Sequence, residues 1–248
     1  MFIDAHSHIL PNIDDGSPDL KTSLALARMA VEDGITHVVC TPHIHLGRFD
    51  NNPQTIADAL AELRAGLQRE NIPLKVAAAA ELRVCSSILK LLKAKQIPFM
   101  GVWKRRKVLL LELPSDRVPK GTERLITWLL ENGIQPLIAH PERNRELQQD
   151  FKQIQRLHQM GCLFQLTSSS IEGKFGPSAQ RICEVMLQKN LAFMIATDAH
   201  NIEYRPPVIS EALKLVKELV GVDRAMDLVC THPFTVSRGM FSHYSFNA

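Results

Sequence analysis

Residues 2–16 read FIDAHSHILPNIDDG, an apolar run that ends at His6 and His8 and leads into Asp14 and Asp15. Its largely continuous apolar character predicts a strand of a parallel sheet that is buried on both faces. Alternate residues of a strand point to the same face, so the two imidazoles are directed to one side. Two imidazoles in this arrangement can bind a single metal ion. The stretch therefore predicts a buried strand whose C-terminal end carries metal ligands.

Six more apolar runs follow along the chain, and amphipathic segments separate them. This alternation predicts strand-helix-strand units around a parallel sheet. The further expected strands are residues 36–42, 75–81, 107–113, 136–142, 162–168 and 193–200. The expected helices are a first one capped by Ser17, with Pro18 at its first position and Gly34 as its stop, and later ones near 56–67, 119–132, 147–160, 177–189 and 207–220.

The polar ends of the expected strands distinguish a closed barrel from an open sheet. Seven strand-helix units in 248 residues suit either a (β/α) barrel or an open doubly wound sheet. Six of the seven runs end in His, Asp or Glu, in the order HSH, TPH, AAE, LLE, AHPE and TDAH. Such groups converge on one mouth when parallel strands close into a barrel, whereas an open sheet would spread them along a line. The sequence thus predicts an α/β barrel with its active site at the C-terminal ends of the strands.

Composition limits the class of protein. With 45% hydrophobic and 22% charged residues, the chain is expected to form one globular domain over residues 1–248. A net charge of only +3 disfavours a nucleic-acid partner. The five cysteines are scattered and odd in number, which favours reduced thiols in the cytoplasm over disulfides or a thiolate zinc site. No signal peptide and no apolar run of membrane-spanning length is found, so no membrane insertion is expected.

Nine polar residues at the expected strand ends are candidate metal ligands. Each could have a structural role alone, for example as a cap or in an ion pair, but burying all of them at one mouth without a cation would be costly. Their number exceeds the needs of one or two ions, so three divalent ions are expected, with Mn²⁺, Fe or Zn²⁺ suited to nitrogen and oxygen ligands. The candidates are His6, His8, Asp15, His43, Glu81, Glu112, His140, Asp198 and His200.

A rival metal-dependent barrel, the amidohydrolase type, also opens with an HxH motif. Resemblance to that type would require a strand-end lysine that can be carboxylated to bridge two ions. In this sequence Glu81 is the more plausible bridging group. The basic run at 104–107 precedes the fourth expected strand, so it is expected at the opposite rim as a solvated face.

The motifs together resemble the polymerase-and-histidinol-phosphatase (PHP) superfamily. They are DAHSHILPNIDDG, TPH at 41–43, Glu81, Glu112, HPER at 140–143, TDAH at 197–200 and a downstream YRP. The closer resemblance is to bacterial manganese-dependent protein-tyrosine phosphatases that are encoded with capsule and exopolysaccharide genes. It implies a distorted (β/α)7 barrel and a phosphotyrosine substrate, notably the tyrosine-rich tail of a cognate bacterial tyrosine kinase.

The resemblance also implies a role for each site residue. One ion would be bound by His6, His8, Glu81 and Asp198, a second by Glu81, Glu112 and His140, and a third by Asp15, His43 and His200. Of the acidic pair, Asp15 is favoured as the ligand and Asp14 as a brace of the loop. Arg143 and Arg205 would bind the phosphate, with a surface salt bridge as the alternative for each.

Two other functions remain open on the sequence alone. A small-molecule phosphatase of the same superfamily, such as a histidinol phosphatase, would share the metal ligands and differ in the rim loops. A catalytically silent metal-binding scaffold would be expected to lack some of the ligands. The C-terminal aromatics could pack on the barrel or join a neighbouring chain, and the oligomeric state is open; these aromatics are Phe234, Phe241, Tyr244 and Phe246.

Overall fold

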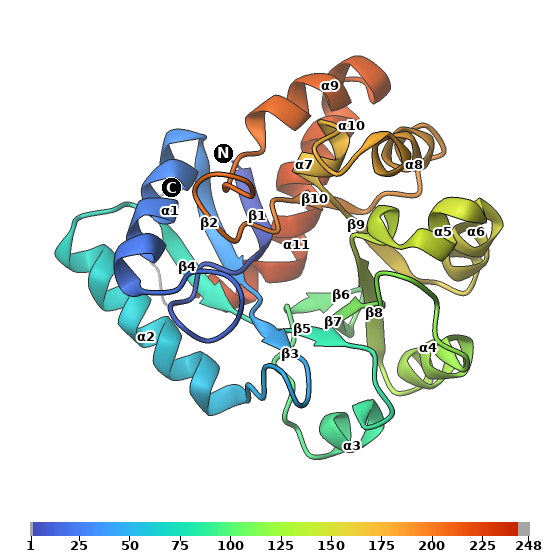
Figure 1. Ribbon diagram of the computed structural model, residues 1–248, viewed down its shortest axis with the longest axis horizontal. Coiled ribbons are helices and arrows are strands. Elements are labelled where there is room, and N and C mark those ends of the chain that lie inside the picture. Colours follow the sequence, from blue (N-terminus) through green and yellow to red (C-terminus); the bar gives the residue numbers. More distant parts are fainter. Residues whose placement is uncertain (1, 243–248) are drawn as a thin grey trace.

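The computed structural model describes residues 2–242 and shows an α/β fold. Strands occupy the middle of the molecule and helices surround them (Figure 1). The α/β class and the parallel pairing of the main strands are as predicted. Among the described residues, no helix combines the length and the apolar character that crossing a membrane requires.

The strands form two sheets. The first has the order β1-β2-β4 and is parallel throughout. The second has the order β10-β9-β8-β7-β5-β3 and is also parallel, apart from β6, which pairs antiparallel with β7. The strands are β1 (Phe2–Ser7), β2 (Ile35–Cys40), β3 (His43–Ile44), β4 (Lys75–Ala78), β5 (Glu81–Arg83), β6 (Val102–Trp103), β7 (Arg106–Glu112), β8 (Ile134–Ala139), β9 (Leu163–Thr167) and β10 (Met194–Ala196).

Backbone hydrogen bonds connect the two sheets at their C-terminal ends. On one side, the N–H of Asp198, just after β10, donates to the carbonyl of His6 in β1 at 2.8 Å. On the other, the N–H of Glu81 donates to the carbonyl of Pro42, just after β2, at 3.1 Å. The ends of strands from both sheets therefore lie around one common region.

The prediction of a single strand at residues 75–81 is wrong. It divides into β4, which pairs with β2, and β5, which pairs with β3 and β7. Ala79 and Ala80 connect the two parts and are both buried. The division occurs because the chain passes from one sheet to the other between Ala78 and Glu81, and the apolar pattern is the same in both sheets.

The predicted helices are present with two corrections, and the short helices α3, α7, α10 and α11 were not predicted. The first correction concerns the start of α1, where Pro18 lies before the helix and not at its first position. Ser17 does not cap the first helix, because Asp19 does so by accepting a hydrogen bond from the N–H of Thr22 at 2.7 Å. Ser17 instead donates its backbone N–H to the carbonyl of His8 at 3.0 Å. The helices are α1 (Leu20–Glu32), α2 (Pro53–Arg69), α3 (Ile88–Lys93), α4 (Thr122–Glu131), α5 (Arg145–Gln149), α6 (Phe151–Gln159), α7 (Ser168–Ile171), α8 (Pro177–Gln188), α9 (Ser210–Val220), α10 (Val222–Met226) and α11 (His232–Ser237).

The second correction concerns the helix predicted at 147–160, which is two helices, α5 and α6. Asp150 interrupts it with a non-helical backbone at φ −130° and ψ 86°. Its carboxylate accepts a hydrogen bond from the N–H of Lys152 at 3.1 Å. An aspartate at this point favours a new helix start, because its side chain replaces the missing partner of the first backbone donors.

Two apolar clusters stabilise the fold. The larger one lies between the strands and the surrounding helices. The smaller one contains buried side chains from strands of both sheets, including Ala5, Val39, Leu110 and Met194, together with Phe241 of the C-terminal segment. Phe241 is fully buried, so this part of the tail packs on the strands. Of the other tail aromatics, Tyr244 and Phe246 lie outside the described residues.

The basic run at 104–107 lies in the turn between β6 and β7 and at the start of β7. All four of its side chains are exposed, and Glu112 lies at the other end of the same strand. The expectation that this basic run forms a solvated face at the N-terminal rim, opposite the candidate metal ligands, is confirmed.

Candidate metal centre

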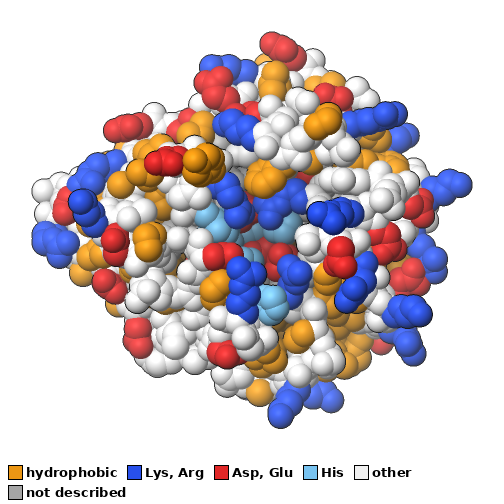
Figure 2. All heavy atoms as spheres, in the orientation of Figure 1, with side chains coloured by type: hydrophobic (Ala, Val, Ile, Leu, Met, Phe, Trp, Pro, Cys, Tyr) orange, Lys and Arg blue, Asp and Glu red, His pale blue; other side chains and the backbone are white. Residues whose placement is uncertain are grey.

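The nine predicted ligands lie together, most of them at or just after the C-terminal ends of strands, whereas His43 and Glu81 are the first residues of β3 and β5. Figure 2 shows histidine, acidic and basic side chains gathered in a hollow at the centre of one face. The hollow contains a polar cavity of about 130 Å³. His6 lies in β1, His43 in β3, Glu81 in β5 and Glu112 in β7, and the remaining five lie in the loops that follow β1, β8 and β10.

The tightest group comprises His6, His8, Glu81 and Asp198, all of which are buried. The Nε2 atoms of the two histidines are 3.2 Å apart. Each of these atoms is 3.3 Å from Oε2 of Glu81 and 3.2 Å from Oδ1 of Asp198. Four atoms from three separate segments of the chain thus surround one point.

These residues fit a divalent ion. Five of the six separations among these atoms are 3.2–3.3 Å, close to the edge of a tetrahedron whose corners lie about 2.0 Å from its centre, the bond length for nitrogen and oxygen ligands of Zn²⁺. Oε2 of Glu81 and Oδ1 of Asp198 are buried without a hydrogen-bond partner among the described residues. Buried carboxylate oxygens without a partner are costly unless a cation binds them.

A second group forms around the other side of Glu81. His43 places its Nδ1 atom 3.0 Å from Oε2 of Glu81 and 3.8 Å from Oε2 of Glu112. On the opposite oxygen, Nε2 of His140 is 2.9 Å from Oε1 of Glu81. Glu81 thus faces imidazole nitrogens with both carboxylate oxygens, whereas the group that could bind an ion here comprises His43, Glu81 and Glu112 without His140.

A third group lies nearer the solvent and comprises His8, Asp15, His43 and His200. Oδ1 of Asp15 is 3.4 Å from Nε2 of His43 and 3.6 Å from Nε2 of His200. The ring of His43 lies between this group and the second one, because its two nitrogens face different carboxylates. The structure thus brings Asp15, His43 and His200 together, and adds His8 to them.

Two residues orient the HxH pair from behind. Asp14 accepts a hydrogen bond from Nδ1 of His8 at 2.6 Å, and Gln165 accepts one from Nδ1 of His6 at 2.7 Å. A hydrogen bond at Nδ1 leaves Nε2 of each ring free to bind a metal. Gln165 carries no signal in the sequence, since nothing in the order of residues shows that β9 faces β1 across the site.

Burial and neighbouring charges set the protonation of the site. Burial alone would raise the pKa of Asp198, but Arg205 and Arg143 hold it well below its ordinary value. Burial and the nearby Arg143 lower the pKa of His140 to about 4, so its imidazole is neutral, as a metal ligand must be. Burial, followed by the charge of Glu81, raises the pKa of Glu112 to about 7. A site that concentrates such shifts is typical of a functional centre.

Two of the candidate ligands have strained backbones. His140 and Asp198 have φ values of 31° and 53°, in the left-handed region that residues other than glycine rarely adopt. Conformations of this kind persist where the surrounding structure imposes them, and they concentrate at functional sites.

Arg143 and Arg205 lie at the mouth of the cavity and both contact Oδ2 of Asp198. This is the oxygen on the far side of the carboxylate from the two histidines. Each guanidinium has five N–H donors, so further donors remain for another anion. Nε of Arg205 is buried without a hydrogen-bond partner among the described residues. The aromatic ring of Phe175 lies 4.7 Å from the guanidinium carbon of Arg143 and 5.9 Å from that of Arg205.

Two further arginines line the cavity and were missed in the sequence. Arg83 donates from Nη1 to Oε1 of Glu112 at 2.5 Å, and Arg48 places Nη2 3.4 Å from Oδ2 of Asp15. The position of Arg83 could have indicated its role, because residues two apart in a strand share a face and Glu81 is the candidate ligand. Arg48 lies in a loop, and only tertiary structure shows that it faces the site.

The sequence of this chain is similar to a family of known proteins and to individual phosphatases. The family of capsular polysaccharide synthesis proteins CpsB/CapC matches residues 2–238. Tyrosine-protein phosphatase YwqE of Bacillus subtilis is 36% identical over 219 residues, which are 88% of this chain and 85% of YwqE. Tyrosine-protein phosphatase CpsB of Streptococcus agalactiae serotype III is 30% identical over 231 residues, 91% of this chain and 94% of CpsB.

Solved structures show the same similarity. A chain from the crystal structures of YwqE of Bacillus subtilis and CpsB of Streptococcus pneumoniae, described as metal-dependent tyrosine phosphatases, superposes with a TM-score of 0.89 at 34% identity. The match covers 96% of this chain and 95% of that one. Histidinol phosphate phosphatase of Lactococcus lactis shares the fold with a TM-score of 0.55 at 13% identity, over 90% of this chain and 93% of that one.

Proposed function

The chain belongs to the capsular polysaccharide synthesis family CpsB/CapC, and from this membership we propose that it is a metal-dependent phosphatase that hydrolyses phosphotyrosine in proteins. The observation that carries the proposal is the group of four buried donor atoms from His6, His8, Glu81 and Asp198, with Arg143 and Arg205 at its rim. Metal ligands beside two guanidinium groups are suited to binding and hydrolysing a phosphate ester.

We assign the nine ligands to three ions, with Mn²⁺ as the expected metal and Fe or Zn²⁺ as alternatives. His6, His8, Glu81 and Asp198 would bind the first, Glu81, Glu112 and His140 the second, and Asp15, His43 and His200 the third. The three groups of donor atoms support this assignment for eight of the nine residues. His140 belongs to none of these groups, and its assignment rests on the 2.9 Å distance between its Nε2 atom and Oε1 of Glu81. His43 also faces the second group and His8 the third, so these two rings are additional candidates there.

Bound divalent ions acidify coordinated water and offset phosphoryl charge. The protein groups do the rest of the positioning. Arg143 and Arg205 would donate N–H groups to the phosphoryl oxygens, where their charge is most useful as the ester bond breaks. The tyrosyl oxygen has an ordinary pKa of about 10, so it leaves with less proton assistance than an alkoxide. Among the described residues that line the cavity there is no cysteine, and the chemistry requires none.

The aromatic ring of Phe175 supports an aryl ester as the substrate. It lies against both arginines and is 37% exposed. An exposed aromatic ring beside phosphate-binding groups can pack against the ring of phosphotyrosine, which adds binding energy that an alkyl phosphate lacks. A tyrosine-phosphorylated protein, in particular the tail of a bacterial tyrosine kinase, is the proposed partner.

We further propose that the two sheets together form one distorted (β/α)7 barrel and that residues 1–248 are one domain. The hydrogen bonds of His6 with Asp198 and of Pro42 with Glu81, and the apolar cluster shared by strands of both sheets, support this interpretation. The five cysteines form no disulfide, in keeping with the expected cytoplasmic location, which stays a prediction.

The experiment that tests the function is an assay of metal-stripped protein reloaded separately with Mn²⁺, Zn²⁺, Fe²⁺ and Mg²⁺. A phosphotyrosyl peptide and histidinol phosphate are the substrates. We expect hydrolysis of the peptide with Mn²⁺, none after chelation, and most of the activity retained after thiol alkylation. The thiols of Cys40, Cys162 and Cys183 are buried and their pKa values are raised by burial, so they are unreactive. Preferential hydrolysis of histidinol phosphate, or full inactivation by a small thiol reagent, would overturn the proposal.

A further inference from the structure

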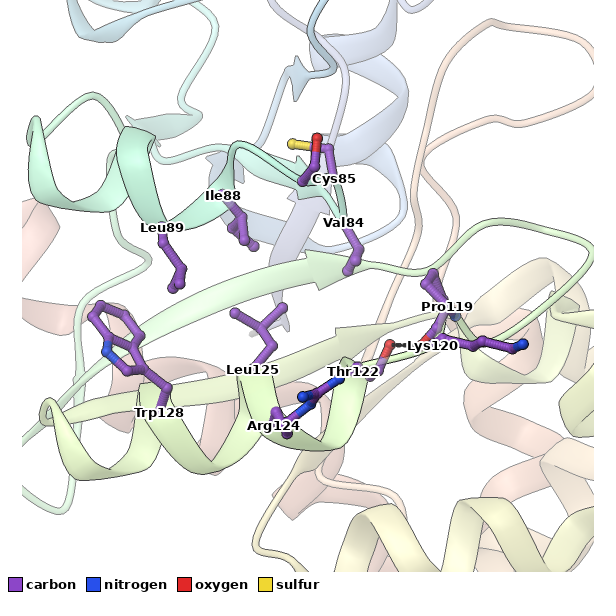
Figure 3. A pocket seen from close by; sticks show the side chains of 12 residues that line it. Val84, Cys85, Ile88, Leu89, Pro119, Lys120, Thr122, Arg124, Leu125 and Trp128 are labelled. Atoms are coloured by element: carbon purple, nitrogen blue, oxygen red, sulfur yellow. Dashed lines mark hydrogen bonds between the residues drawn. The ribbon is translucent and has the colours of Figure 1, made fainter.

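An apolar groove lies between α3 and α4. It has a volume of about 540 Å³. Figure 3 shows Ile88 and Leu89 of α3 facing Leu125 and Trp128 of α4 across it. Leu89 is 37% exposed, although leucine of a helix that packs on a core is usually covered. Nothing in the metal chemistry uses this groove.

The lining of the groove and the lining of the metal cavity meet at consecutive residues of the chain. Arg83 lines the metal cavity, and the next residue, Val84, lines the groove. The N–H of Val84 donates to the carbonyl of Glu112, a candidate ligand, at 2.9 Å. Consecutive Cα atoms are about 3.8 Å apart, so the two linings adjoin at Arg83 and Val84. A peptide whose phosphotyrosine enters the cavity can place residues a few positions away in the groove, since an extended chain spans about 3.3–3.6 Å per residue.

The positive charge at the groove favours a peptide with acidic residues. Lys120 and Arg124 belong to its lining, and both are exposed. The twelve described lining residues include no acidic one. Within residues 2–242, Lys120 and Arg124 form no ion pair, and the neighbouring Glu123 is paired with Arg156. Two unpaired cations beside apolar side chains complement a segment with an apolar side chain and carboxylates.

We propose that this groove binds the segment of the phosphotyrosyl substrate that flanks the phosphotyrosine, and that it favours an aromatic or aliphatic side chain next to an acidic residue. The inference rests on the proposed function, which it extends from the phosphate ester to the surrounding peptide. The cavity then recognises the phosphoryl group, and the groove determines which phosphotyrosines in a protein are dephosphorylated fastest.

The test compares three phosphotyrosyl peptides with p-nitrophenyl phosphate, which is too small to reach the groove. One peptide has alanines on both sides of the phosphotyrosine, and the other two have a Phe-Asp pair on its N-terminal or its C-terminal side. We expect one Phe-Asp peptide to exceed the alanine peptide about tenfold in kcat/KM, as burial of one apolar side chain would give. Leu89→Asp, and separately Lys120→Glu with Arg124→Glu, should remove most of that advantage.

The matched control for charge is Lys152→Glu with Lys189→Glu, two exposed lysines outside the lining of the groove and of the cavity. In this control the advantage of the Phe-Asp peptide should be retained. The proposed role of the groove would be wrong if kcat/KM were equal for the three peptides in the unmodified protein. It would also be wrong if the advantage of the Phe-Asp peptide survived Leu89→Asp. Failure to hydrolyse p-nitrophenyl phosphate with any metal instead overturns the proposed function, so the two failures are distinguishable.

Discussion

Asp14 and Asp15 are neighbours in the chain, yet they face different partners. Asp14 is buried against Nδ1 of His8 and also accepts the N–H of His43 at 3.0 Å. Asp15 is partly exposed and faces the Nε2 atoms of His43 and His200. This geometry favours Asp15 as a ligand and Asp14 as the group that orients His8, although the assignment stays a prediction.

Asp15→Asn is expected to reduce the number of bound ions by about one, because an amide is a weaker ligand for a divalent ion than a carboxylate. Asp14→Asn should reduce it less, because its side chain can still accept the hydrogen bond from His8. Elemental analysis of both variants after equilibration with Mn²⁺ measures the difference. Equal metal content in the two variants would contradict the assignment.

The two arginines at the rim contact Asp198, so each has a structural contact as well as the proposed role in phosphate binding. Arg143→Ala or Arg205→Ala should cost about 2–4 kcal/mol in kcat/KM for a phosphotyrosyl peptide, as for other preorganised electrostatic groups. Arg143→Lys should recover only part of the loss, since an ammonium keeps the charge but not the two-pronged donor geometry.

Arg181→Ala is the control for these arginine variants, because Arg181 is exposed and lies outside the linings of the metal cavity and of the groove. Metal content should be close to normal in all of them. If Arg143→Ala and Arg205→Ala kept normal turnover with full metal content, the proposed contacts with phosphate would be wrong. If both lost metal in proportion to activity, the contact with Asp198 would explain the effect instead.

The loop that follows β1 holds the metal ligands by folding back on its own strand. Gly16 lies so close to His8 that a Cβ at residue 16 would be 2.0 Å from the carbonyl oxygen of His8 and 2.5 Å from its Cβ. Real Cβ atoms do not approach backbone this closely, so any other residue would displace the loop or the ligand. Glycine is required here by close approach, and not by its backbone dihedral angle.

Gly16→Ala should therefore lower both metal content and hydrolysis of p-nitrophenyl phosphate at least several-fold. Gly239→Ala is the matched control, because no atom lies within 4 Å of a Cβ at that position. Metal content follows from elemental analysis and folding from circular dichroism. Normal metal binding in folded Gly16→Ala would show that the loop does not determine the position of His8.

At the scale of the whole molecule, the C-terminal segment that contains Phe241 packs against His37 of β2. His37 of β2 is buried, and its ring lies 4.9 Å from that of Phe241 in an edge-on arrangement. Burial, with a smaller effect of Lys75, lowers the pKa of His37 from 6.5 to about 4. The folded protein therefore holds this imidazole neutral at pH values where the unfolded chain would protonate it.

The unfolded chain binds the extra proton between pH 6.5 and about 4, so the contribution of His37 to stability is complete above pH 6.5 and is lost as pH falls through this range. In His37→Leu, the free energy of unfolding should fall less steeply with decreasing pH, by up to about 1.4 kcal/mol per pH unit. Urea denaturation of metal-free protein between pH 4 and 7 measures both slopes. Parallel slopes would show that His37 is not held neutral.

Much of the fold could be predicted because its signals are local. The apolar runs, the helix ends at Gly34, Gly133 and Gly161, and the strand-helix alternation each depend on a few adjacent residues. The errors have local as well as tertiary causes. Asp19, and not Ser17, caps α1, and residues 75–81 belong to two different sheets. The short elements α3, β3 and β6 also gave no distinct pattern, since each has only two to six residues.

The sequence by itself determined the chemical types at the site, because imidazoles and carboxylates at successive strand ends have few other uses. Only the tertiary structure decided which atoms meet. His6 and Gln165 are 159 positions apart, and their hydrogen bond depends on the pairing of whole strands. The same holds for Arg48, Phe175 and the groove between α3 and α4. Strand order and loop conformation result from packing summed over the entire chain, and no local pattern of residues encodes them.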